Sequence, residues 1–187
     1  LNARPQQEPD MQRRTFIQYL TLGGAVAGIG AGYAWLNAGH DHTQLSIAAT
    51  LQRLESLSSG DIQKTGVWNP HQVFNHCAQS VEFSMTGFPQ SKSQVFQHTA
   101  GRLAFSVFSA KGEMSHPLDE VIPGAPDLAV EGDATLALQR LATALREFES
   151  FEGTLQPHFA FGQLDKADYA LAHVLHINNH LQEFQPA

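Results

Sequence analysis

The sequence predicts an all-α protein built as an antiparallel helical bundle. From residue 43 onward, apolar residues recur at three- and four-residue steps in five segments, the spacing of helices that bury one face. No segment alternates cleanly between apolar and polar residues, as a half-buried strand would. The connections between these segments are short or medium, which favours a bundle of neighbouring helices in one domain.

The first two expected helices have recognisable ends. One helix is expected over Thr43–Ser59, and Gly60 ends it, because glycine readily adopts the backbone conformation that follows a last helical turn. The second is expected over Pro70–Thr86. Asn69 suits its N-cap, since the side-chain oxygen accepts a hydrogen bond from a free backbone N–H, and Pro70 suits the first helical position, which needs no donor.

Three further helices follow, separated by two loops. The third is expected over about Ser93–Ala110, and residues 111–132 then form a loop because they hold three prolines and three glycines. Asp133 suits the cap of a fourth helix. After a second loop over Glu152–Leu164, the last helix is expected from about Asp165 to Phe184.

Composition limits the classes of function. The 187 residues carry a formal charge of −7, which argues against a nucleic-acid partner, because phosphate backbones are bound by clustered Lys and Arg. A single cysteine excludes an intramolecular disulfide and an all-cysteine zinc site. The unusual count is ten histidines, all at or beyond position 40.

Residues 1–39 are expected to be a targeting segment and not part of the folded domain. Arg13 and Arg14 precede Thr-Phe-Ile and an uncharged run to Leu36, which is typical of a twin-arginine export signal; an ordinary signal anchor is the alternative. We therefore expect a periplasmic or extracytoplasmic domain over residues 40–187. The sequence leaves open whether the signal is cleaved or remains as a membrane tether. That domain holds 8 basic and 16 acidic residues, a charge of −8.

Three histidines share one face of the last helix. At 100° per residue, His173, His176 and His180 fall within a stripe about 60° wide, beside the apolar Ile177. Burial of an imidazole carries a desolvation penalty and leaves its ring nitrogens in need of partners. A divalent cation bound by these nitrogens compensates for both effects. The spacing of His176 and His180 is that of HExxH zinc sites, but Ile177 replaces the Glu, which weakens a metalloprotease interpretation. A polar helix face without metal is the alternative.

A mononuclear site needs a further ligand from another helix. His76 is the best candidate, because it lies at the edge of the apolar arc of the second helix. Cys77 competes, although a buried structural cysteine is its simpler interpretation. His158 precedes the last helix and is a candidate for the mouth of a site, whereas His116 is expected to be an ordinary loop residue.

These residues resemble the DinB/YfiT-like superfamily of metalloenzymes over most of residues 43–184. The likeness rests on Trp68-Asn69-Pro70 followed by His76, and on His176 with His180 in the final helix. An uncharacterised branch is similar in the loop over residues 122–126 and in the segments over residues 161–164 and 180–184. The resemblance implies a DinB-like antiparallel four-helix bundle with an extra short helix and long loops, which binds a divalent metal through His76, His176 and His180.

Two classes of function follow. Three histidines leave a coordination position for water or substrate, which is typical of a catalytic site, and the resemblance implies a hydrolase or a thiol S-transferase of unknown substrate. A non-catalytic metal- or small-ligand-binding module is the alternative. The metal is expected to be zinc, nickel or a similar ion, the partner is a small molecule, and a homodimer is left open. Side chains that could support the ligands or the pocket are His173, Tyr169, Gln79, Glu183 and His158.

Overall fold

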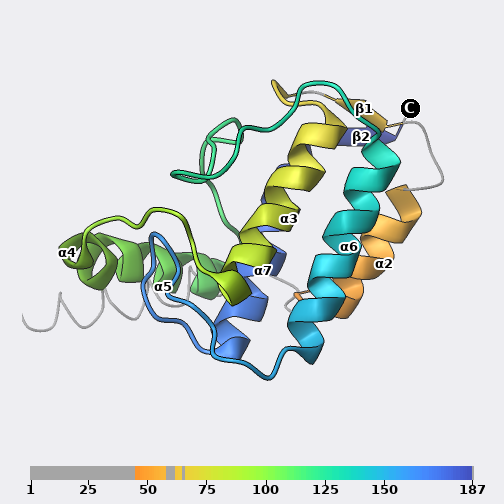
Figure 1. Ribbon diagram of the computed structural model, residues 1–187. Coiled ribbons are helices and arrows are strands. Elements are labelled where there is room, and N and C mark those ends of the chain that lie inside the picture. Colours follow the sequence, from red (N-terminus) through yellow and green to blue (C-terminus); the bar gives the residue numbers. More distant parts are fainter. Residues whose placement is uncertain (1–44, 58–61, 65, 187) are drawn as a thin grey trace, which may run out of the picture. The chain divides into compact units, whose positions relative to one another are not determined.

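The computed structural model describes residues 45–57, 62–64 and 66–186 (Figure 1). These residues are mostly helical, so the all-α prediction is confirmed in its coarse form. Four helices pack side by side and contribute to a common core (Figure 1). They are α2 (Ile47–Leu57), α3 (Pro70–Thr86), α6 (Ala134–Ser150) and α7 (Lys166–His180).

Local capping explains why α3, α6 and α7 begin where they do. The Asn69 side chain accepts from the Gln72 N–H, and the Gln72 side chain accepts from the Asn69 N–H, a reciprocal capping box at the start of α3. Asp133 accepts from two backbone N–H groups of α6, and Asp165 caps α7 by accepting from the Asp168 N–H. The expected bounds of α3 and the expected cap of α6 are therefore confirmed.

The third helical segment is interrupted by a π-helical turn. It runs through α4 (Gln94–Phe96), the π-helix η2 (Gln97–Gly101) and α5 (Arg102–Lys111). Gly101 allows this segment to lie against the loop before α7, because a Cβ there would overlap the carbonyl oxygen of Ala160. The Gln97 amide donates to the carbonyl oxygen of Phe159 at 3.1 Å, which ties the π-turn to the same loop.

The last helix ends earlier than the sequence predicts. Helix α7 ends at His180, a 3-10 turn η3 (Leu181–Glu183) follows, and β2 (Phe184–Pro186) pairs with β1 (Ile62–Lys64). The pairing is antiparallel, with Gln63 opposite Gln185. The expected extension of the helix to Phe184 is wrong, because backbone hydrogen bonds to a distant strand replace helical ones there.

The core lies between α3 and its neighbours. Helix α3 is buried over much of its circumference because α6 and α7 both pack against it. The largest fully buried apolar side chains of these helices include Phe74, Leu141, Leu145, Phe148 and Leu175. Within the described part of the chain, no helix combines the length and apolar character needed to cross a membrane.

Candidate metal centre

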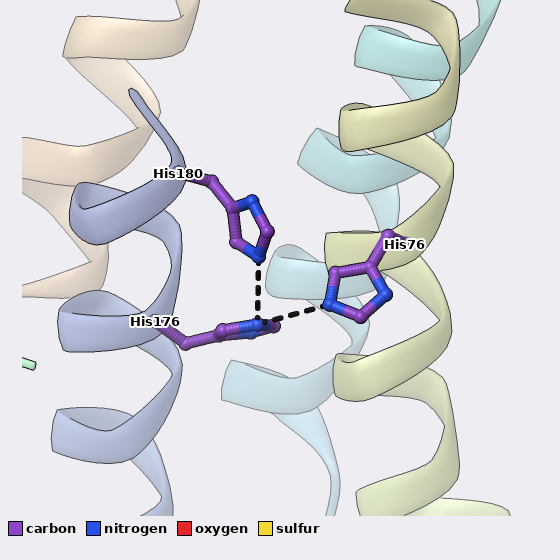
Figure 2. A group of neighbouring side chains, drawn as sticks. All are labelled: His76, His176 and His180. Carbon is purple, nitrogen blue, oxygen red and sulfur yellow. Dashed lines mark hydrogen bonds between the residues drawn. The ribbon is translucent and has the colours of Figure 1, made fainter. Parts of the chain in front are cut away.

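Three histidines converge between α3 and α7. His76 extends from α3, and His176 and His180 extend toward it from successive turns of α7 (Figure 2). The Nε2 atom of His176 lies 3.2 Å from Nε2 of His76 and 3.2 Å from Nε2 of His180. Ligand nitrogens of all three lie within 4.8 Å of one another. The packing of α3 on α7 thus assembles residues one hundred positions apart.

The donor set fits a metal ion. Ligand nitrogens about 2.0–2.1 Å from a tetrahedral zinc ion are separated by roughly 3.3–3.4 Å, close to the 3.2 Å distances observed here. Burial, and then the neighbouring His116, lowers the pKa of His76 to about 3. Burial, followed by His76 and His116, lowers the pKa of His180 to about 2. Both rings are therefore neutral near pH 7, the state in which imidazole binds metals.

The third ligand nitrogen is in the same state. The pKa of His176 lies well below its ordinary value, chiefly through burial and then through His180, His76 and His116. The three neutral imidazoles face one another, with Nε2 of His176 3.2 Å from Nε2 of each of the other two. The three histidines could bind a metal.

Aromatic packing holds two of the ligand rings. Trp68, directly before α3, is nearly parallel to the His180 ring, with 6.2 Å between centroids and 4° between planes. It also lies 5.0 Å from the His76 ring. The Nδ1 atoms of His76 and His180 are buried without a hydrogen-bond partner among the described residues. In many metal sites a hydrogen bond to the second ring nitrogen fixes the orientation of a histidine ligand. Here the Trp68 indole packs against the His76 and His180 rings and restricts their orientation instead. The sequence pointed to Trp68 only as part of a helix start.

A cavity of about 290 Å³ adjoins the cluster, and His76 and His176 form part of its wall. Most of its other lining side chains are apolar or aromatic, while Lys92 and Glu120 bring charge to it. The larger apolar contributors are Phe96, Phe108, Met114, Ile122, Phe159 and Phe161. Such a lining suits a small, largely apolar compound.

His158 lies on the wall of this cavity and is buried. Its Nδ1 accepts hydrogen bonds from the backbone N–H groups of Ala160 and Phe161, both at 3.1 Å. The ring proton is consequently on Nε2. The ring stacks on Phe161 at 4.3 Å, and burial lowers the pKa of His158 to about 3, with a smaller contribution from His173.

His173 and Tyr169 are engaged elsewhere on α7. The Ser84 hydroxyl donates to the Val81 carbonyl oxygen, so His173 Nε2–H donates to Ser84 at 3.2 Å. The Tyr169 hydroxyl donates to the Gln156 carbonyl oxygen at 2.6 Å. His173 lines the cavity, but these bonds link α7 to α3 and to the loop before α7.

The remaining candidate side chains lie around the site in different surroundings. The Gln79 amide donates to the Pro126 carbonyl oxygen at 3.3 Å and so holds the loop after α5. The Glu183 carboxyl group lies against Gly66, where a Cβ would overlap it, and burial, followed by Asp119, raises its pKa. Cys77 is fully buried, and burial raises the pKa of its thiol, which keeps it protonated. The supporting roles of Gln79 and Glu183 stay predictions.

The residue that sequence reasoning missed is His116. Its ring centroid lies 5.1 Å from that of His176 and 5.1 Å from that of His180. It also lines the cavity. No periodic pattern identifies it, because it stands in the irregular segment between α5 and α6. The only available signal was that it is a histidine.

The comparisons identify a family but no activity. Residues 40–187 match a family model described as "Protein of unknown function (DUF1569)". This family is not DinB/YfiT, so the expected membership in that superfamily is wrong. The likeness rested on two short motifs, and histidines one helical turn apart recur in unrelated helical proteins. No curated protein and no solved structure gives a match.

The expected export signal falls on residues 1–39, outside the described residues. The family match begins at residue 40 and says nothing about that segment. Neither the structure nor the comparisons support a twin-arginine signal.

Proposed function

The chain belongs to the DUF1569 family, and we propose that it is a metal-dependent enzyme, a hydrolase or a thiol S-transferase that acts on a small, largely apolar substrate. One observation carries the proposal. Three neutral histidine nitrogens converge beside a largely apolar cavity of about 290 Å³. A structural site would instead be expected to be closed by a full set of protein ligands.

The donor set favours zinc, nickel or a similar ion, because neutral imidazole suits these metals. Such an ion, when bound, would supply Lewis acidity, which lowers the pKa of water to about 7 or activates a thiolate. Two ligands come from successive turns of α7 and one from α3, so packing of rigid helices fixes their positions. Trp68 limits rotation of two of the rings.

The cavity side chains supply binding and orientation. Phenyl rings such as Phe108 and Phe161 bury apolar parts of a substrate and exclude water. His158 Nε2–H is available as a hydrogen-bond donor to a substrate carbonyl or carboxylate, since its Nδ1 is already occupied. Lys92 and Glu120 add one charge of each sign to the cavity lining, where they can bind polar groups of a substrate.

Elemental analysis of the purified protein tests the metal site directly. We expect about one equivalent of metal in the parent protein and strongly reduced metal in His76→Ala and His180→Ala. His98→Ala, which changes an exposed histidine outside the cluster, serves as the control and should retain metal. Equal metal content in all four proteins would show that the ligand set is wrong.

Turnover tests the enzymatic part of the proposal. The loaded protein should act on at least one member of a panel of apolar esters, amides and thiol conjugates. His176→Ala should lose that activity while its circular dichroism spectrum is retained. Stoichiometric metal binding without turnover on such panels would favour the non-catalytic binding module instead.

A further inference from the structure

We propose that His116 is a fourth, exchangeable nitrogen ligand of the metal held by His76, His176 and His180. This inference rests on the metal site of the proposed function and adds to it a ligand carried by a loop. Its support comes from the hydrogen bond that sets the tautomer of the ring, from the neighbouring rings and from the segment that carries it.

The hydrogen bond made by His116 determines which ring nitrogen carries the proton. Nδ1 lies 2.7 Å from the carbonyl oxygen of Pro117. A carbonyl oxygen only accepts, so Nδ1 is the protonated donor and Nε2 of the neutral ring carries a free lone pair. A metal-binding histidine shows this same arrangement, with one nitrogen fixed by a backbone carbonyl and the other free to coordinate.

His116 Nε2 is buried and has no hydrogen-bond partner among the described residues. A buried acceptor left without a partner destabilises the folded state, so an interaction that satisfies it is expected. A metal ion bound by the neighbouring histidines would satisfy this lone pair.

The ring spacing agrees with a shared ion. The centroid of His116 lies 5.1 Å from those of both His176 and His180. The three helix-borne rings are 4.8 to 5.0 Å apart. His116 thus keeps nearly this spacing to the two ligand rings of α7.

The loop that carries His116 is anchored at several points. Met114 and Ile122, on either side of it, are buried with exposed fractions of 5% and 3%. Farther along, the side chains of Gln79 and Asn69 donate to the carbonyl oxygens of Pro126 and Val130. The loop therefore holds His116 near the cluster, but no helix fixes it as α7 fixes His176.

Because three of the histidines are carried by helices and His116 by a loop, we expect them to have different roles. The three helix-borne nitrogens keep the ion in place, while His116 closes the fourth position when no substrate is bound. Release of His116 would open that position toward the cavity, which His116 itself lines. A loop-borne ligand of this kind excludes adventitious ligands from the resting site.

Metal titration of the full chain tests this role without using activity. Metal-free protein is titrated with Co²⁺ while its visible absorption is recorded, and Zn²⁺ affinity is measured by chelator competition. His116→Gln should weaken Zn²⁺ binding by about tenfold or more, because even outer partners of ligands account for about 10- to 100-fold. Its Co²⁺ bands should lose intensity, as expected when water replaces a nitrogen and the coordination number rises.

His98→Gln is the matched control and should leave both readouts unchanged. His116→Ala should reproduce both changes, and circular dichroism should show that each variant is folded. Unchanged affinity and spectrum in both His116 variants would overturn the inference and leave the three-histidine site intact. Lost turnover with an unchanged spectrum would also overturn it, since His116 would then act on substrate. Failure of the parent protein to bind either ion would refute the proposed function and this inference together.

Discussion

At the scale of single residues, His173 and His176 show that neighbours on one helix face can have different environments. His173 donates to Ser84 and lies between two aromatic rings, with Phe148 at 4.9 Å and Tyr169 at 5.4 Å. His176 instead faces two other histidines. The shared stripe on the helix therefore predicts burial for both but does not distinguish a packed histidine from a metal ligand.

His173 should make stability depend on pH. Burial lowers its pKa from 6.5 to about 3, so the folded protein keeps it neutral while the unfolded chain protonates it. The contribution of His173 to the free energy of unfolding is complete above pH 6.5. It is lost as pH falls from 6.5 toward 3, by up to about 1.4 kcal/mol per pH unit. Urea denaturation between pH 7 and 5 should show a smaller decrease for His173→Leu than for the parent or for His98→Gln. Equal decreases in all three would contradict the assignment.

At the scale of elements, the π-turn η2 positions a wall of the cavity. Gln97 donates to the carbonyl oxygens of His158 and Phe159, and Gly101 lets the loop approach the helix closely. His158 and Gly162 also pair through their backbones, which closes the loop into a tight turn. The placement of His158 thus depends on an irregular turn in another segment, as is common for π-helical turns at functional sites.

Gly101→Ala should destabilise the protein although alanine favours helices. In an unobstructed helix this change would add about 0.5–1 kcal/mol of stability. Here the new Cβ overlaps the Ala160 carbonyl oxygen, and overpacking of this kind costs about 1–3 kcal/mol. Urea denaturation measures the net effect, with the exposed Ser106→Ala on α5 as a control. A gain in stability would show that the loop moves aside at no cost.

At the scale of the whole molecule, the candidate metal site joins distant parts of the chain. It connects α3 to α7, which are also joined by the side-chain bond between Ser84 and His173. On another side of α3, Arg140 of α6 forms a two-pronged ion pair with Glu82. An ion bound between α3 and α7 would therefore favour the folded chain over the unfolded one.

Metal should raise the melting temperature of the parent protein. A ligand present at about 100 times its Kd, and bound only by the folded state, adds about 2.7 kcal/mol. Thermal unfolding followed by circular dichroism, with and without Zn²⁺, measures this gain. His176→Ala should melt at the same temperature in both conditions, while His98→Ala should gain as the parent does. A gain that persists in His176→Ala would place the bound ion elsewhere.

The sequence by itself determined where α3, α6 and α7 begin and two of the histidine positions. Asn69, Pro70 and Asp133 act on backbone groups within a few residues, so their effect is visible locally. His176 and His180 share a helix face because of helical periodicity alone. The short motifs also indicated His76, although they led to the wrong family.

Tertiary structure alone decided the rest of the site. His116 reaches the cluster through a loop that Gln79 of α3 and its N-cap Asn69 hold at Pro126 and Val130, and no local pattern encodes these contacts. The end of α7 at His180 likewise depends on pairing between Phe184 and Lys64, which are far apart in the chain. Local sequence therefore fixed the elements that carry the ligands, whereas the cavity and the loop-borne histidine arise from contacts between segments that sequence periodicity does not relate.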